Sequence, residues 1–300
     1  MKSVVSGRFV GKAGLAVGVA IVLAACTAGG GGGTTSGKPP HRPALTDAVD
    51  SVNAALGKAS EAKNLTEFDT ALVLLGSAAG LGGQKLGWAD DPADAGAATA
   101  KNQMVFALTS LADDVATLRS HMERHRVCAL SSAKAELGAS GGLADASKAL
   151  TKLAAAGYSA SLSVPQLPKQ QIRSLQNGTM VRGGKTHGQG AFEVDNSGTT
   201  DAVVSLALNG KAVHSVFVAK GQKAGIESVE DGTYEVYVAY GSDWDTEAKG
   251  FTLDCEYSKF EDTFAFETGR TTTSWTITLQ QTTDGNAKTN DVDPNAFPQP

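Results

Sequence analysis

The hydrophobic pattern of the chain changes its period once, and this change constrains the fold more than any other feature. From His41 to about Gly157, apolar residues recur every three or four positions, the spacing of one helical face. From about Met180 onward, apolar and polar residues alternate, as in half-buried strands. The pattern predicts an α+β chain with segregated domains, an N-terminal α-helical bundle followed by an antiparallel β-sandwich. The predicted ranges are 41–158 for the bundle, 159–179 for a linker, 180–283 for the sandwich and 284–300 for an acidic, proline-containing tail.

Capping residues and glycines indicate where the first helices begin and end. A first helix carries apolar residues at spacings of four, three and four, beginning at Leu45. Asn64 and Glu67 have the spacing of a capping box, which predicts the start of a second helix. The glycines at positions 80, 82 and 83 predict its end.

Two further helices follow in the predicted bundle. Asp91, as N-cap, and Pro92, in the first turn, predict the start of a long third helix. Its apolar stripe runs from Met104 to Met122, and glycines from position 138 onward end it. A last helix is predicted roughly over 143–156, which gives four helices in all.

The alternating region contains eight candidate strands separated by turn signals such as Asn209-Gly210 and Asp231-Gly232. Short antiparallel strands at this spacing, with no helical pattern between them, favour a sandwich over a parallel α/β sheet. The predicted strands are Ala191–Asp195, Ala202–Leu208, Val213–Val218, Ala224–Ser228, Tyr234–Tyr240, Phe251–Tyr257, Thr263–Glu267 and Thr272–Leu279.

The first 25 residues have the pattern of a secretory signal peptide, with basic residues followed by a short apolar run. The run ends in Leu23-Ala24-Ala25-Cys26, which resembles the lipobox of bacterial lipoproteins. The resemblance implies that Cys26 is acylated, with palmitate among the acyl chains, and becomes the mature N-terminus. Residues 26–40, which include five consecutive glycines, are then a tether. We therefore expect a secreted, lipid-anchored chain on the outer face of the cell membrane.

The charge balance bears on the class of partner. The chain has 26 Lys and Arg against 31 Asp and Glu, a net charge of −5, and the predicted signal peptide contributes only basic residues. Nucleic-acid-binding domains carry a basic patch or stripe, so this composition argues against nucleic acid as a partner.

Three cysteines occur, and lipidation of Cys26 leaves Cys128 and Cys255 as a pair. Two cysteines in an exported chain predict a disulfide between the bundle and the sandwich. The bridge requires Cα atoms within about 7 Å, so the third helix should dock against the strand Phe251–Tyr257. The alternative is two separate buried thiols.

His121, His125 and Cys128 are spaced i, i+4 and i+7 on the predicted third helix. Imidazole and thiolate are zinc ligands, so the three residues are a candidate metal site. There is no fourth ligand at a convincing spacing, and His125 continues the apolar stripe. We therefore expect packing at the edge of the bundle, and no metal and no other cofactor.

Asp243, Trp244 and Asp245 form a compact acidic segment with an indole. An exposed Trp among carboxylates could bind a sugar or Ca²⁺. The alternative is a hairpin in which Trp244 packs against the sandwich edge and the aspartates shape the turn. We favour the hairpin.

The segment Asp231-Gly232-Thr233-Tyr234 resembles the Gly-x-Tyr hairpin of prealbumin-like sandwiches, the carboxypeptidase-regulatory-like modules. The C-terminal region is also similar to uncharacterised lipoproteins of high-GC Gram-positive bacteria. The residues that carry this likeness are Gly241–Asp245 and the tail motifs Gly285-Asn286-Ala287, Asp293-Pro294 and Phe297-Pro298. The likeness implies location and fold, and no activity.

These observations predict a non-catalytic lipoprotein that binds or positions another component of the cell envelope. Its expected partners are the membrane, through the lipid anchor, and an unidentified envelope component. One alternative is a solute-binding lipoprotein, which would require two α/β lobes around a cleft. The other is a metal-dependent enzyme built on His121, His125 and Cys128.

Overall fold

The computed structural model describes residues 41–185, 187–279 and 288–300. The predicted signal peptide, Cys26, the tether and the first residues of the predicted tail lie outside the described residues. Among the residues described, no helix combines the length and the hydropathy needed to cross a membrane.

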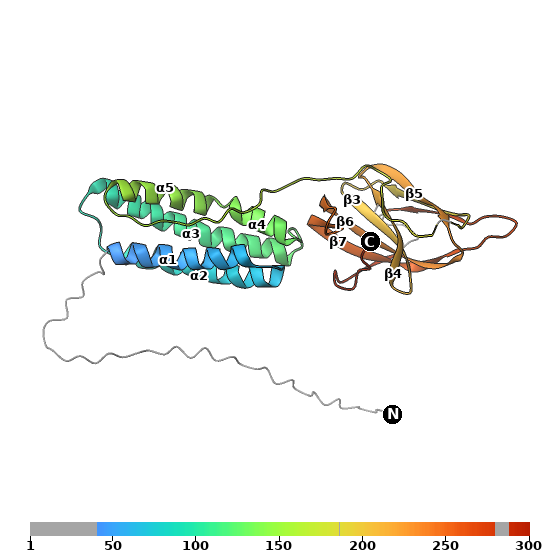
Figure 1. The fold of residues 1–300 in the computed structure, drawn as a ribbon, viewed down its shortest axis with the longest axis horizontal. Helices are drawn as coiled ribbons and strands as arrows, with labels where there is room; N and C mark the ends of the chain where they lie inside the picture. Colours follow the sequence, from blue (N-terminus) through green and yellow to red (C-terminus); the bar gives the residue numbers. More distant parts are fainter. Residues whose placement is uncertain (1–40, 186, 280–287) are drawn as a thin grey trace, which may run out of the picture. The chain divides into compact units, whose positions relative to one another are not determined.

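Within the described ranges the helical region contains five helices, and four of them are long enough to form the bundle (Figure 1). α1 packs against α2, α2 against α3, and α3 against α5. The prediction of an N-terminal helical region is confirmed, but a short helix, α4, was not predicted. The helices are α1 (His41–Glu61), α2 (Leu65–Trp88), α3 (Ala95–Glu123), α4 (Leu130–Gly138) and α5 (Gly141–Ala155).

One of the two predicted helix starts is correct. The Asn64 side chain accepts a hydrogen bond from Glu67 N at 2.8 Å and caps α2. At α3 the prediction of Asp91 is wrong, because Asp94 caps the helix by accepting from Ala97 N at 2.7 Å. Asp91 instead binds the buried ammonium group of Lys101 at 2.8 Å.

The glycines at positions 80, 82 and 83 do not end the second helix, which continues to Trp88. A Cβ atom on Gly82 would lie 2.9 Å from Ala48 Cβ of α1, and one on Gly83 would lie 3.4 Å from Leu108 Cβ of α3. These two glycines therefore allow close helix packing. Gly82 and Gly83 therefore reflect tertiary packing and do not mark a helix end.

This packing predicts opposite effects for alanine at neighbouring glycines. Nothing lies within 4 Å of a Cβ on Gly80, so Gly80→Ala should raise the free energy of unfolding by about 0.5–1 kcal/mol through the helix propensity of alanine. Gly82→Ala should lower it by about 1–3 kcal/mol, because α1 and α2 must move apart. Urea denaturation of both variants measures the difference, and destabilisation by Gly80→Ala would contradict the packing argument.

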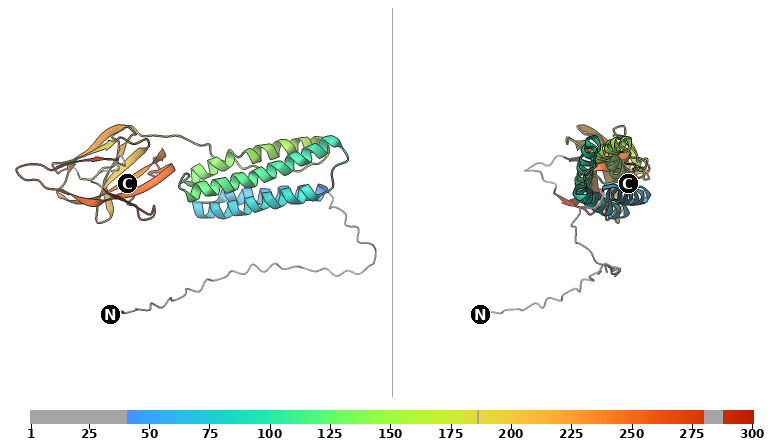
Figure 2. Two further views of the ribbon diagram at one scale, coloured as in Figure 1. Left: turned by 180° about the vertical axis from the view of Figure 1, so that it is seen from behind. Right: turned by 90° about the vertical axis from the view of Figure 1, so that its left-hand side faces the viewer.

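Nine strands of the described region form two sheets. One has the order β1-β4-β3-β6-β7-β9 and the other the order β5-β2-β8. The left view of Figure 2 shows the strand region from behind. Apolar side chains from both sheets, including Phe192 and Val236, share one buried core. The strands are β1 (Met180–Arg182), β2 (Gly190–Asn196), β3 (Asp201–Leu208), β4 (Lys211–Val218), β5 (Gln222–Val229), β6 (Gly232–Asp245), β7 (Gly250–Phe266), β8 (Ser274–Thr278) and β9 (Thr289–Asp291).

The sandwich differs from its prediction in pairing and strand length. The two strands predicted at Phe251–Tyr257 and Thr263–Glu267 are parts of one strand, β7. All the strand pairs are antiparallel except β2 with β8, which is parallel. The described part of the C-terminal tail packs on the sheet, since β9 pairs with β7 and the Phe297 ring lies 5.0 Å from that of Tyr257.

The resemblance to a Gly-x-Tyr hairpin correctly indicates a buried tyrosine but not a hairpin. Tyr234 is 1% exposed and its ring lies 5.5 Å from that of Phe266. However, β5 and β6 belong to different sheets, so the Asp231-Gly232 turn carries the chain from one sheet to the other. Gly232 has a φ of 156°, which suits glycine at this change of sheet.

The predicted linker, 159–179, has no regular structure for most of its length, but it packs on both parts of the chain. Leu162 and Leu167 lie against the helical core, and Leu175 lies against the sandwich. Asn53 of α1 binds the linker backbone twice, through Ser161 O at 2.8 Å and Ser163 N at 2.7 Å.

Candidate functional site: the junction of helices and sandwich

The segment that follows α3 pairs with the edge of β7. Residues 124–128 run antiparallel to residues 252–255 and exchange three backbone hydrogen bonds with them at 2.8–3.0 Å. A β-bridge joins Val127 to Leu253. His125 has a φ of 55°, a conformation in which histidine is enriched. The segment after α3 thus pairs with the sandwich through its backbone.

The disulfide between Cys128 and Cys255 closes this pairing, with a Cα–Cα distance of 6.3 Å. The predicted bridge is therefore confirmed. The predicted position of Cys128 on the third helix is wrong, because α3 ends at Glu123. An extended segment, and not the helix itself, meets β7. Cys255 is buried in an apolar cluster with Phe217 and Trp244.

Arg173 and the buried carboxylate of Asp243 form an ion pair at the junction. Arg173, in the linker, donates to Asp243 Oδ1 and Oδ2, each at 2.8 Å, from its Nε and Nη2 atoms. Its Nη1 donates to Asp245 at 3.1 Å, and its backbone N–H donates to Asp243 at 2.8 Å. The Asp243 side chain is 1% exposed, while that of Arg173 is 37% exposed. A guanidinium suits this role because its planar fork binds a carboxylate through two parallel hydrogen bonds.

The neighbours of Asp243 keep it ionised despite its burial. Burial favours the neutral acid, but hydrogen bonds from Arg173 and Thr252 outweigh it and hold the pKa of Asp243 below its ordinary value. The pKa of Asp245 is also lowered, because the backbone N–H groups of Ala248 and Glu247 donate hydrogen bonds to its carboxylate. The hydrogen bond to Asp243 raises the pKa of Arg173.

A chain of hydroxyl groups links this ion pair to the helical region. Thr252 Oγ1 donates to Asp243 Oδ2 at 2.5 Å, and Ser132 Oγ, on α4, donates to Thr252 Oγ1 at 2.7 Å. Ser132 and Thr252 are both buried. The linker, the sandwich and α4 therefore meet at one polar cluster, which we call the junction cluster: Ser132, Arg173, Asp243, Asp245 and Thr252.

The candidate ligand segment Asp243-Trp244-Asp245 lies inside this cluster, in β6. Trp244 is 2% exposed, and its ring lies 5.0 Å from that of Phe251. An indole that stacks on a sugar must be exposed, so the exposed Trp that this hypothesis requires is absent at this position. Both carboxylates bind Arg173, as described above, which leaves them a structural role.

The candidate metal residues are not assembled into a ligand set. His121 Nδ1 lies 2.7 Å from Glu136 Oε1, His125 is exposed beyond the helix end, and Cys128 is in the disulfide. In the ranges described, no group of three or more His, Cys, Asp or Glu residues is arranged to hold a metal ion.

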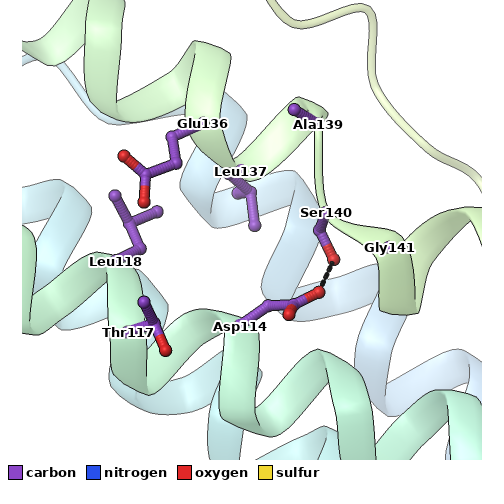
Figure 3. A pocket seen from close by; sticks show the side chains of 8 residues that line it. All are labelled: Asp114, Thr117, Leu118, Glu136, Leu137, Ala139, Ser140 and Gly141. Atoms are coloured by element: carbon purple, nitrogen blue, oxygen red, sulfur yellow. Dashed lines mark hydrogen bonds between the residues drawn. The ribbon is translucent and has the colours of Figure 1, made fainter.

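A cavity of about 210 Å³ lies between α3, α4 and the start of α5 (Figure 3). Two acidic residues line it, and both have partners. Asp114 accepts from Ser140 Oγ at 2.6 Å and from Gly142 N at 3.0 Å, which caps α5, and Glu136 pairs with His121. The carboxylates of this cavity therefore stabilise helix packing.

A buried histidine in the sandwich gives a pH-dependent prediction. His214, on β4, is 1% exposed; its Nδ1 accepts from Gly184 N at 3.1 Å and its Nε2 has no partner among the described residues. Burial lowers the pKa of His214, with Glu230 opposing the shift weakly. The unfolded chain therefore binds the proton more readily, and stability should fall as the pH drops below about 6.5, by at most about 1.4 kcal/mol per pH unit.

Urea denaturation at pH 7 and pH 5 measures this effect. His214→Gln should flatten the pH dependence, whereas the exposed control His125→Asn should leave it unchanged. Equal slopes for the wild type and His214→Gln would show that another group is responsible.

No protein family, curated protein or solved structure matches the chain.

Proposed function

We propose that this protein is a lipid-anchored module of the cell envelope that binds or positions another envelope component without catalysis. Cys26 carries the anchor, and the described region is the folded part that faces away from the cytoplasm. The observation that carries the proposal is the junction, where a disulfide, a three-hydrogen-bond pairing and a buried ion pair join the helices to the sandwich.

Two features of the junction favour a scaffold. Its links come from two separate segments, the one after α3 and the linker. They therefore restrict the rotation of the helices relative to the sandwich about more than one axis. The disulfide is also typical of extracytoplasmic proteins, because the cytosol keeps thiols reduced. A component bound by the helices or by the sandwich would therefore keep a fixed position relative to the other.

The same findings weaken the two alternatives. The metal-dependent enzyme requires a Cys128 thiolate, but this sulfur is bonded to Cys255. The solute-binding lipoprotein requires two α/β lobes, whereas this chain places its helices before its strands.

Acyl labelling of intact cells tests the anchor. The wild-type chain should incorporate radioactive palmitate and fractionate with membranes, because two acyl chains suffice for stable attachment. Cys26→Ala should lose both properties. Cys128→Ser is the matched control, since it also removes a sulfur but leaves the lipobox intact. Palmitate incorporation by Cys26→Ala would overturn the proposal.

A further inference from the structure

The solvent-facing side of α2 carries a row of exposed apolar side chains, which we call the α2 stripe: Val73, Leu74, Leu81 and Trp88. Their exposed fractions are 44%, 42%, 56% and 67%. Leu74, Leu81 and Trp88 are spaced seven residues apart, which places them on one face of the helix. Isolated apolar residues are common on protein surfaces, whereas several on one helix face are typical of an interaction site.

The stripe is also nearly free of charge. From Thr70 to Trp88, α2 contains a single charged residue, Lys85. The other exposed residues between the stripe positions are Ser77, Gly80, Gln84 and Gly87. A solvated helix face normally carries many charges, so this composition is unusual for a surface in contact with water alone.

The helices of the bundle leave this face uncovered. α1 meets α2 on the side of Gly82, close to Ala48, and α3 meets it on the side of Gly83, close to Leu108. All four stripe side chains are more than two fifths exposed to solvent.

The end of the helix that carries Trp88 lies beside the start of the described chain. Because α1 and α2 are antiparallel and Ala48 faces Gly82, His41 and Trp88 lie at the same end of the bundle. Burial lowers the pKa of His41, and the charges of Asp90 and Asp91, which follow α2, oppose that shift. The residues from Cys26 to His41 can span at most about 50 Å, and α2 is about 36 Å long. An acyl group on Cys26 therefore keeps the α2 stripe within reach of the lipid surface.

We propose that the α2 stripe docks on the lipid surface to which the chain is anchored. This inference rests on the proposed lipid anchor at Cys26. Trp88 suits the membrane interface because its ring is apolar and its N–H is polar. Lys85 can extend its ammonium group to the headgroups while its stem lies along the apolar surface. The docked helix lies in the plane of the interface, with α1 and α3 above it.

A second copy of the chain is the competing occupant. Stable protein interfaces bury about 800 Å² per partner, whereas an exposed row of four side chains on one helix offers on the order of a few hundred Å². The lipid surface needs no complementary partner of that size, because the anchor already holds the chain beside it.

Fluorescence quenching by brominated lipid tests the docking. The mature acylated protein, which begins at Cys26, is reconstituted in phosphatidylcholine vesicles with and without bromine on the acyl chains. Trp88 should be quenched, so the brominated lipid should lower the emission of the wild type and Trp88→Phe should abolish most of that loss. Trp275→Phe is the matched control and should retain the quenching, and Trp244 is buried.

A second pair of variants checks the surface without altering a tryptophan. Leu81→Gln should reduce the quenching of Trp88, whereas Ile172→Gln, at an exposed apolar residue of the linker, should not. Co-sedimentation with the vesicles is measured in every sample.

Three results would overturn the inference. If the wild type co-sediments but Trp88→Phe leaves the quenching unchanged, the anchor stands and the docking fails. If the wild type does not co-sediment, the anchor fails and the docking fails with it. If the protein forms a dimer that Leu81→Gln abolishes, and Trp88 is not quenched, the second copy is the occupant.

Discussion

Removal of the disulfide is expected to lower the free energy of unfolding by about 4–5 kcal/mol. Cys128 and Cys255 are separated by 127 residues in the sequence, and a long loop restricts the unfolded chain strongly in the chain-entropy treatment. The variant Cys128→Ser/Cys255→Ala suits the site, because Cys255 is buried among apolar side chains and an alanine introduces no hydroxyl group there. Urea denaturation monitored by circular dichroism measures the change.

Two controls distinguish the stabilisation by the covalent bridge from the stabilisation by the packing of its sulfur atoms. Reduction of the wild type with dithiothreitol should reproduce most of the loss without any change of side chain. Thiol titration of the unfolded, unreduced Cys26→Ala protein should find almost no free thiol. Two free thiols per chain, or a double variant as stable as the wild type, would contradict the predicted stabilisation.

Arg173→Ala is expected to destabilise the protein by about 3 kcal/mol. The substitution leaves the Asp243 carboxylate, 1% exposed, without its cation, and an uncompensated buried charge costs about 3–5 kcal/mol. The lower value applies because the guanidinium itself is more than one third exposed to solvent. Asp243→Asn in the Arg173→Ala background should recover part of the loss by removing the buried charge.

The pH dependence identifies the charge as the cause. The pKa of Asp243 is held below its ordinary value, so its contribution is present above about pH 4 and is lost as the pH falls through its folded-state pKa. Arg173→Ala should weaken this acid-dependent loss. Lys223→Ala is the matched control, because its pair with Asp195 is exposed to solvent and should contribute little to stability. Equal losses in the two variants would refute the role of burial.

The order of the domains could be predicted because periodicity is a local property of the sequence. The alternation that places Val236 and Val238 inside the sandwich is visible in the residues themselves, and so is the stripe from Met104 onward. The end of α2 could not be predicted, because glycine favours a helix end locally while Gly82 is required by Ala48, a residue of another helix. The parallel pairing of β2 with β8 likewise depends on the path of the intervening chain.

At the junction, too, one interaction could be predicted from the sequence and another could not. Counting cysteines was enough to predict the disulfide, since only one intramolecular pair remained after Cys26. The role of Arg173 left no signal, because it lies in a region without periodicity and its partner Asp243 is seventy residues further along the chain. In the sequence, Asp243 is distinguished only by its neighbour Trp244, whereas its main interaction is with Arg173 of the linker.

The position of the disulfide has a consequence for a protein exposed to proteases. The linker, 159–179, lies inside the loop that Cys128 and Cys255 close. A protease that cuts the backbone once anywhere between these two cysteines produces two peptides that remain one covalent molecule, with the N-terminal segment still joined to the sandwich. Such a nicked protein migrates as the intact chain on a non-reducing gel and as two fragments after reduction. The bridge therefore preserves attachment to the proposed anchor even after the polypeptide has lost its continuity.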